Sequence, residues 1–287
     1  MSKNYVDVIW NPKNRGKNGN VSVGEDIAFS VSAATRGIDM LLAKFKGEAF
    51  QSEVQFAPVE KPDVPQLAKP LAEAKLAFVT DGGLVPKGNP DQLPPVSAQR
   101  FCVYPLCGAK KLEAEDYEVS HQGYETRYVA EDPNRLVPLD AATAAVEAGK
   151  IGSVLDFYYV TAGVMTSAED SHTFGKRIAA SLVCNNVDAV IISSTCGTST
   201  RCGACIAWEI ERKGIPVVHV TNLAHISEWI GCSRILYGKD IRYVFGDPSL
   251  SPDAEENYRK NLFDKALELL EKAPEANTSL VVNTAEK

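Results

Sequence analysis

The stretch DAVIISSTCGTSTRCGAC, residues 188–205, decides the fold class because it joins a buried strand to a helix through a loop of small residues. Residues 188–193 are an apolar run with the length expected of a strand covered on both faces. Small polar residues follow, and a helix is expected from about Cys202 to Lys213, where Gly214 ends it. A strand that leads through a short loop into a helix is the repeating unit of parallel α/β sheets.

The same unit recurs on both sides of this stretch. Further strands are expected at 75–80, 154–161, 215–220 and 241–245. Helices are expected over 28–46, from Asp140 to Gly149, from Ser167 onward, and from Ser251-Pro252 to about Lys272. Asp140, Ser167 and Ser251 are of residue types that cap helix N-termini, and Ser167 with Asp170 resembles a capping box. The pattern predicts an α/β fold: a doubly wound, mostly parallel sheet with helices on both faces, plus an N-terminal helical or extended arm.

The organisation along the chain is expected to have three parts. Residues 1–70 are interpreted as an arm, a helix and a proline-rich linker, and residues 71–273 as the α/β catalytic domain. A division of that domain into two α/β lobes that meet near residue 150 is an alternative. Residues 274–287 are expected to be a disordered tail.

The composition favours a protein of the cytoplasm. Hydrophobic residues make up 45% of the 287 residues, the formal net charge is −7, and no apolar run has the roughly 18 residues of a membrane span. The sequence has no dense stripe of lysine and arginine, so nucleic-acid binding is not predicted. The first 20 residues lack the apolar core of a signal peptide. Seven cysteines is an odd number, so reduced thiols are expected rather than a disulfide scaffold.

Cys196 is the cysteine that the local sequence marks as a nucleophile. It lies between a buried strand and a helix, where unpaired backbone N–H groups and the positive end of the helix dipole are expected. Arg201 adds a positive charge nearby. All three effects favour the thiolate, which is the reactive form of cysteine. Cys202 is interpreted as either a resolving thiol or a buried one.

Other interpretations of the cysteines remain open. Core packing is expected for Cys102, Cys107, Cys184, Cys205 and Cys232. No metal site is expected, because the C-x5-C-x2-C spacing is not a usual zinc motif and no histidine lies close in sequence. The loop has neither the Lys-Ser/Thr ending of a P-loop nor a G-x-G-x-x-G fingerprint.

Several segments resemble one known family. STCGTSTRCGA, residues 194–204, is similar to the selenocysteine segment of the substrate-specific protein B of glycine, sarcosine and betaine reductases. The resemblance runs from about residue 35 to 273. In the family's order it includes LAFVTDGGLVPKGNPDQL (76–93), EDYEVSHQGYET (115–126), EDPNRLVPLD (131–140), GIPVVHVTN (214–222) and GDPSLSPDAEE (246–256).

The resemblance implies a subunit of a multi-protein reductase that cleaves the C–N bond of a small amino acid: glycine, sarcosine or betaine. The amine leaves, and the two-carbon acid unit passes to a selenocysteine on the partner protein A. Protein C then forms acetyl phosphate, and thioredoxin restores the electrons. The implied partners are protein A, protein C and a pyruvoyl-type or N-terminal-half subunit in an oligomer. No cofactor is expected in this chain, although the family typically carries selenocysteine at the position of Cys196.

The chain departs from the family in three respects. Position 196 is cysteine, position 199 is serine where the family usually has cysteine, and the N-terminal half of the family's subunit has no counterpart. A redox pair at the spacing of residues 196 and 199 is therefore not expected. The substrate is left open among glycine, sarcosine and betaine.

Together, the residues and the resemblance give the candidate site. His121 is a candidate acid–base partner of the thiolate, and Lys87 a candidate for holding a carboxylate. The expected catalytic residues are Cys196, Cys202, Arg201 and His121. The expected substrate-binding residues are Gly82, Gly83, Lys87, Asn89, Thr195, Gly197, Thr198, Ser199 and Thr200.

Two other functions are weighed beside the reductase. One is an isomerase or racemase that uses thiols as acid and base, which requires two facing cysteines. The other is a non-catalytic scaffold subunit of the reductase complex.

Overall fold

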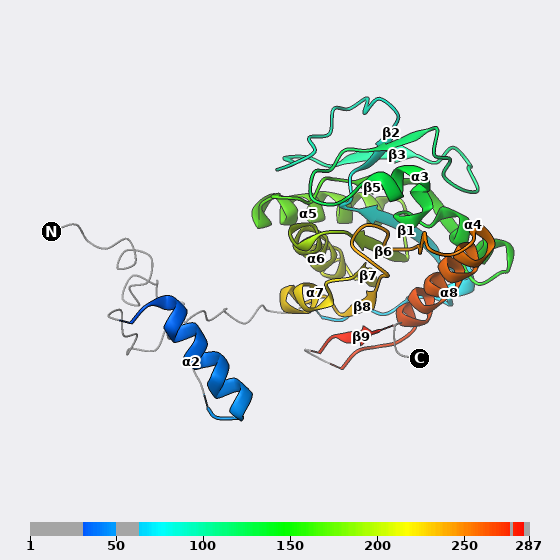
Figure 1. The fold of residues 1–287 in the computed structure, drawn as a ribbon. Coiled ribbons are helices and arrows are strands. Elements are labelled where there is room, and N and C mark those ends of the chain that lie inside the picture. The colour runs from blue at the N-terminus through cyan, green and yellow to red at the C-terminus, as the bar shows by residue number, and fades with distance from the viewer. Residues whose placement is uncertain (1–30, 50–62, 276–277, 284–287) are drawn as a thin grey trace. The chain divides into compact units, whose positions relative to one another are not determined.

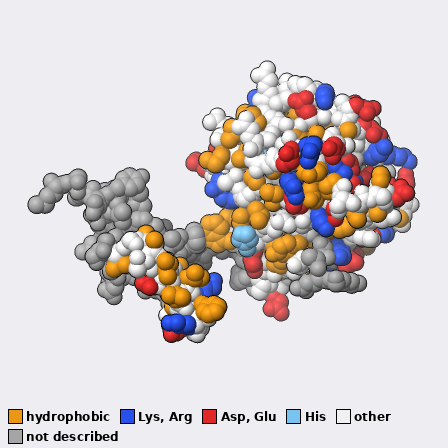
Figure 2. Space-filling view, in the orientation of Figure 1, with side chains coloured by type: hydrophobic (Ala, Val, Ile, Leu, Met, Phe, Trp, Pro, Cys, Tyr) orange, Lys and Arg blue, Asp and Glu red, His pale blue; other side chains and the backbone are white. Residues whose placement is uncertain are grey.

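The computed structural model describes residues 31–49, 63–275 and 278–283. The chain divides into two units, Met1–Val59 and Glu60–Lys287. In the first unit, the helix α2 spans Ala33–Lys46, between an N-cap at Ser32 and a left-handed Gly47. Hydrophobic side chains gather along α2 (Figure 2), and four of them are exposed: Ile38, Leu41, Leu42 and Phe45.

The second unit is built around a seven-stranded sheet with the order β3-β5-β1-β6-β7-β8-β9. The antiparallel strand β3 lies on one edge and pairs with β5, whereas the other neighbours are parallel. The bounds are β1 Lys75–Thr80, β3 Cys102–Pro105, β5 Ser153–Val160, β6 Ala189–Ser194, β7 Val217–Thr221, β8 Arg234–Tyr237 and β9 Leu280–Val282. A separate ribbon pairs β2 (Leu84–Pro86) with β4 (Tyr117–Val119). The predicted α/β fold with a mostly parallel sheet is therefore confirmed.

The helices cover both faces of the sheet. Figure 1 shows α5, α6 and α7 on one side and α4 and α8 on the other. Their bounds are α4 Leu139–Glu147, α5 Ala168–Cys184, α6 Gly197–Glu211, α7 Ala224–Ile230 and α8 Pro252–Leu270. Short helical turns at η2 Leu71–Glu73, α3 Arg127–Glu131 and η3 Pro133–Arg135 lie in the connections.

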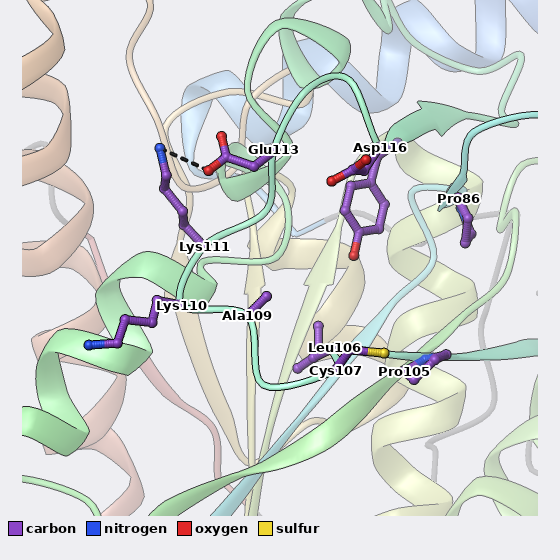
Figure 3. Close-up of a pocket in the computed structure, with 10 residues that line it drawn as sticks. Pro86, Pro105, Leu106, Cys107, Ala109, Lys110, Lys111, Glu113 and Asp116 are labelled. Carbon is purple, nitrogen blue, oxygen red and sulfur yellow. Dashed lines mark ion pairs between the residues drawn. The ribbon is translucent and has the colours of Figure 1, made fainter.

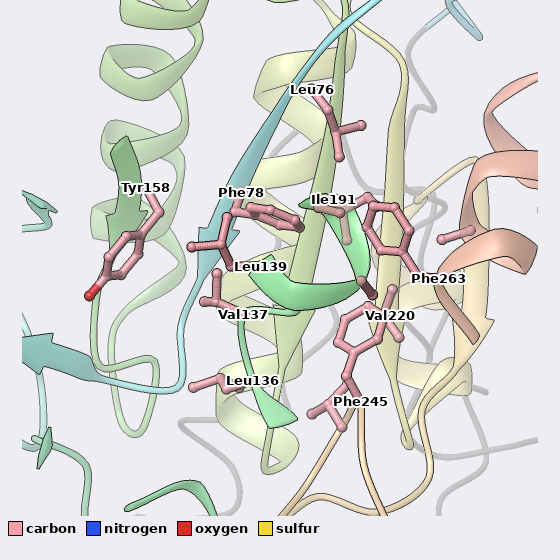
Figure 4. Close-up of a cluster of buried hydrophobic side chains, with 14 of the residues drawn as sticks. Leu76, Phe78, Leu136, Val137, Leu139, Tyr158, Ile191, Val220, Phe245 and Phe263 are labelled. Carbon is pink, nitrogen blue, oxygen red and sulfur yellow. The ribbon is translucent and has the colours of Figure 1, made fainter. Parts of the chain in front are cut away.

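Each face of the sheet has its own hydrophobic core, because alternate strand residues point to opposite sides. On β1, Phe78 packs with Leu139 and Phe263 (Figure 4), whereas Ala77 and Val79 pack against α5 and α6. The two cores fix the sheet between its helix layers.

The sheet changes direction between β1 and β6. Along the chain, β5 is added on one side of β1 and β6, β7 and β8 on the other, which is the 2-1-3-4-5 order of doubly wound folds. In such sheets the loops after the two strands at the reversal separate, and they leave room for a site at their carboxyl ends.

Several local predictions differ from the structure. Residues 241–245 form turns, and the strand is instead Arg234–Tyr237. This strand begins with a buried arginine, so its sequence lacks the continuous apolar run expected of a buried strand. The helix α6 begins at Gly197 rather than near Cys202, so packing overrides the low helix propensity of Gly, Thr and Ser. In the expected disordered tail, Leu280–Val282 form β9.

The predicted helix caps have mixed outcomes. Ser167 Oγ accepts a hydrogen bond from the Asp170 backbone N–H, as the capping-box pattern indicated. Ser251 is the N-cap of α8, with proline at the first helical position. The expectation for Asp140 is wrong, because Pro138 is the N-cap of α4 and Asp140 lies in the first turn.

Among the described residues, no helix is both long and apolar enough to cross a membrane. Figure 2 shows acidic and basic side chains interspersed on the visible face of the second unit.

Candidate active site

Three loops meet at the carboxyl ends of β1, β5 and β6, where the sheet reverses. Asp81 follows β1 directly, and its carbonyl oxygen accepts a hydrogen bond from the N–H of Gly163 in the loop after β5 (2.8 Å). In the same loop, the N–H of Met165 donates to Thr198 Oγ1 at the start of α6 (3.1 Å). The loops after β1 and β5 therefore enclose the beginning of α6.

Cys196 lies at the centre of this junction as the N-cap of α6. It is half-buried, and its carbonyl accepts the first helical hydrogen bond from Thr200 (2.8 Å). The N–H groups of the first helical turn have no carbonyl partner within the helix, and the dipole places partial positive charge there. The start of α6 therefore presents unpaired N–H donors and partial positive charge at the end where Cys196 lies.

Ser199 connects Cys196 to His121. The thiol of Cys196 donates to Ser199 Oγ (3.4 Å), and His121 Nε2 lies 2.8 Å from the same oxygen. The backbone N–H of Gly123 donates to His121 Nδ1 (3.0 Å), so Nδ1 carries no proton in the neutral ring. In this tautomer Nε2–H is the donor to Ser199.

Burial lowers the pKa of His121 to about 4. The ring is therefore neutral near pH 7, and its Nε2 has no lone pair with which to accept a proton from the thiol. The geometry favours a role for His121 as a hydrogen-bond donor that holds Ser199 beside the sulfur. Its ring also packs against Tyr124 at 4.8 Å between centroids.

Two glycines allow the loops to approach Cys196 this closely. A Cβ atom on Gly123 would lie 2.8 Å from the sulfur, and one on Gly163 would lie 2.7 Å from Ser199 Cα. The same Cβ on Gly123 would also lie 2.9 Å from Val164 Cγ2. The surroundings of the sulfur thus combine polar groups with apolar side chains.

The other predicted catalytic residues lie on different sides of α6. Cys202 is fully buried against α5, and burial raises the pKa of its thiol well above the usual value. Arg201 donates to the carbonyl of Thr166 in the loop after β5 (2.6 Å). Its positive charge lowers the pKa of Cys202 and Cys205, although burial outweighs it at both.

The predicted substrate-binding residues are only partly brought together. Gly82 and Thr195 lie side by side: a Cβ on Gly82 would be 3.2 Å from Thr195 Cγ2. Lys87 is exposed in the turn after β2, and Asn89 shapes that loop through hydrogen bonds with Leu93 (3.0 and 2.9 Å).

The other residues of that set have structural contacts. Thr200 Oγ1 lies 2.8 Å from Thr221 Oγ1 on β7. At Gly83, a positive φ of 73° makes a side chain unfavourable.

Sequence reasoning missed the loop after β5, and it gave no role to Asp81 and Tyr124, which lie in segments that resemble the family. Tyr124 donates to the Gly82 carbonyl (2.9 Å), and Asp81 accepts from the Thr195 N–H (3.4 Å). Their positions directly after β1 and inside a matched segment were the available signals.

The remaining cysteines show that spacing alone is a weak guide to burial. Cys102, Cys205 and Cys232 are buried as expected, but Cys107 and Cys184 are exposed. Within the described residues, no group of three or more His, Cys, Asp and Glu side chains is arranged to hold a metal ion.

Two surface cavities lie away from Cys196. One cavity, of about 580 Å³, lies beside β3 (Figure 3), and the residues that line it include Cys107, Lys110 and Tyr117. The other, of about 470 Å³, is lined by charged residues that include Arg135 and Arg259. Neither includes a residue of the junction around Cys196.

The sequence matches a known protein family. Residues 13–195 match the family described as glycine/sarcosine/betaine reductase selenoprotein B. The chain is 42% identical over 245 residues to the glycine reductase complex component B subunit gamma of Carboxydothermus hydrogenoformans. It is 39% and 37% identical, respectively, to the betaine and sarcosine reductase complex component B subunit beta of Peptoclostridium acidaminophilum.

These alignments cover 85%, 83% and 82% of this chain but only 56%, 54% and 54% of the relatives. The chain thus spans about half the length of the curated relatives it matches. No solved structure matches the chain.

Proposed function

Because this chain belongs to the glycine/sarcosine/betaine reductase selenoprotein B family, we propose that it carries the nucleophile for reductive cleavage of the C–N bond of glycine, sarcosine or betaine. Cys196 stands at the position where the resemblance implies selenocysteine. The observation that carries the proposal is the placement of Cys196 as N-cap of α6 at the reversal of the sheet. A half-buried sulfur at that point can be reached by a small substrate and lies at the positive end of a helix dipole.

The side chains around Cys196 suit a displacement at carbon. The thiolate attacks the α-carbon of the substrate, an S–C bond forms, and the amine leaves with the C–N electron pair and takes up a proton. Once the thiol is ionised, the Ser199 hydroxyl is free to donate to the sulfur, because His121 Nε2–H donates to the Ser199 oxygen. The first-turn N–H groups of α6 also attract the carboxylate of the amino acid.

The partners in this proposal follow from the resemblance. The two-carbon acid unit would pass to the selenocysteine of protein A, and protein C would form acetyl phosphate. A pyruvoyl-type or N-terminal-half subunit would complete the substrate site. We place this assembly in the cytoplasm.

Substitution of Cys196 in the reconstituted complex tests the proposal. Cys196→Ser should lower amine release from the substrate by at least about 10²-fold, the scale expected when a nucleophile is removed. Cys107→Ser and Cys184→Ser are matched controls, because both thiols are exposed and lie outside the junction. Limiting iodoacetamide should modify Cys196 before these two.

The alternatives predict different results. Full activity of the complex with Cys196→Ala would contradict a nucleophilic role and support a scaffold subunit. The isomerase alternative needs a second thiol facing Cys196, but the hydrogen-bonding groups near its sulfur are the hydroxyls of Thr198 and Ser199. Exchange of the substrate α-hydrogen with solvent in the absence of a reductant would favour that alternative.

A further inference from the structure

A chain of buried polar side chains runs beneath the loop that holds Cys196. Ser194 Oγ donates to Oδ2 of Asp81, and His219 Nε2 lies 2.6 Å from Ser194 Oγ. On the other side of the ring, His219 Nδ1 lies 2.6 Å from Ser227 Oγ on α7. All four side chains have no solvent exposure. These hydrogen-bonded side chains link the ends of β1 and β6 to the middle of β7 and to α7.

The space around this chain is tightly closed. A Cβ on Gly203 of α6 would lie 2.5 Å from Asp81 Oδ2, 2.2 Å from Ser194 Oγ and 2.9 Å from His219 Nε2. Only a glycine lets the helix pass this close to the three polar groups. The hydrogen bonds are therefore made within the protein and shielded from solvent.

No cation neutralises Asp81 in the described part of the chain: none of its lysines or arginines forms an ion pair with this carboxylate. The titratable groups near it are His219 on β7, whose ring is linked to it through Ser194, and Tyr124 and Cys202, because the charge of Asp81 raises the pKa of both. Burial raises the pKa of the Asp81 carboxyl well above its usual value, despite hydrogen bonds that favour the anion. A buried carboxyl without a cation partner binds a proton readily.

His219 faces Ser194, Ser227 and Cys232, whose sulfur lies 3.6 Å from Nδ1. Burial lowers the pKa of His219 to about 3, so the ring is neutral near pH 7. A neutral imidazole has one donor and one acceptor nitrogen, so each of its two tautomers fits one direction of the hydrogen-bond chain.

The hydrogen bonds are thus consistent in two arrangements that differ by one proton. With Asp81 ionised, Ser227 donates to Nδ1, Nε2–H donates to Ser194, and Ser194 donates to the carboxylate. With Asp81 protonated, every donor reverses: the carboxyl donates to Ser194, Ser194 donates to Nε2, and Nδ1–H donates to Ser227. A proton gained at one end of the chain can therefore appear at the other end without the ring becoming charged.

We propose that Asp81, Ser194, His219 and Ser227 store one exchangeable proton beneath Cys196, and that the charge of Asp81 controls the ionisation of that thiol. Asp81 accepts a hydrogen bond from the N–H of Thr195, the residue before Cys196. Tyr124 lies near enough to both groups that the charges of Asp81 and Cys196 each raise its pKa. Asp81 is a positioning residue here, and the inference rests on the proposed role of Cys196 as nucleophile.

The test measures the alkylation rate of Cys196 by peptide mass spectrometry from pH 6 to pH 10, in the whole chain and in Asp81→Asn. The asparagine amide donates to Ser194 as a protonated carboxyl would, but it cannot lose the proton. In wild type, the two interacting groups should titrate in coupled steps. In Asp81→Asn, the alkylation rate should rise in a single step whose midpoint lies about one pH unit below that of wild type. At a pH below both midpoints, Cys196 of the variant should therefore react about tenfold faster.

Asp188→Asn is the matched control. Asp188 precedes β6 at the opposite end of the sheet, where it accepts the Lys75 N–H (2.7 Å) and pairs with Lys69. Its profile should follow wild type. Superimposable profiles for wild type and Asp81→Asn would overturn the proposal. Poor reactivity of Cys196 in wild type would instead count against the proposed function.

A second measurement needs no variant. In protein with ¹⁵N-labelled histidine, the His219 ring should change from the Nδ1–H tautomer to the Nε2–H tautomer as pH rises through the Asp81 titration. A single His219 tautomer across that range would refute the proton store, whatever Cys196 does.

Discussion

Replacing Gly123 with alanine should displace the sulfur of Cys196 without removing any functional group. The new methyl carbon would lie 2.8 Å from the sulfur and 2.8 Å from His121 Cε1. Non-bonded heavy atoms are comfortable at about 3.5–4.0 Å, so the sulfur or the loop must retreat by about 1 Å. A displacement of this size at a reacting atom costs about 10²-fold in rate. The packing strain should lower the free energy of unfolding by about 1–3 kcal/mol.

Two assays separate these effects. The alkylation rate of Cys196 should fall about tenfold because the methyl group also covers the sulfur, and amine release by the complex should fall about 10²-fold. Urea unfolding measures the change in stability. Gly37→Ala in α2 is the control, because a Cβ there meets nothing within 4 Å. Wild-type reactivity together with wild-type stability in Gly123→Ala would show that residues 121–123 do not pack against Cys196.

Three further predictions follow from other contacts. Ser199→Cys should form a disulfide with Cys196 under mild oxidation, since the hydroxyl oxygen already lies 3.4 Å from the sulfur; two free thiols by mass spectrometry would contradict this. His219 has a native pKa of about 3 against about 6.5 when unfolded, so its contribution to stability is complete above pH 6.5 and is lost as pH falls toward 3. Between pH 7 and pH 5 the wild-type protein should lose about 2 kcal/mol of unfolding free energy through this histidine. In His219→Asn, the decline measured by urea unfolding over the same pH range should be smaller by that amount. An equal decline in the two proteins would contradict this prediction. Glu255→Ala leaves Arg135 without its two-bond partner (2.8 and 2.9 Å) and should cost about 3–5 kcal/mol in urea unfolding, whereas a fall below about 1 kcal/mol would show that the pair is not buried in solution.

Local signals in the sequence were sufficient for the fold class and for the choice of Cys196 as the candidate nucleophile. The apolar run at 188–193 indicated a buried strand because both faces of a central parallel strand are covered. Ser167 and Ser251 indicated helix starts because their hydroxyls, or the proline after them, suit the first turn. Cys196 was marked by its place between strand and helix, which depends only on neighbours along the chain.

The surroundings of Cys196 depend on contacts between distant parts of the chain. Ser199 lies 78 residues from His121, and Ser194 lies 113 residues from Asp81. No local pattern contains such pairs, so sequence reasoning assigned Asp81 no role. Nor did it show that both ring nitrogens of His219 lie in a chain of buried polar side chains.

The sequence by itself determined an alternating α/β chain with one cysteine between a central strand and a helix, because periodicity and capping are local properties. Only the tertiary structure decided what that cysteine touches. The order of the strands brings the ends of β1, β5 and β6 together, and glycines at 123, 163 and 203 let the backbone approach closely. Strand order and close approach are long-range properties, set by how the two cores pack on either side of the sheet.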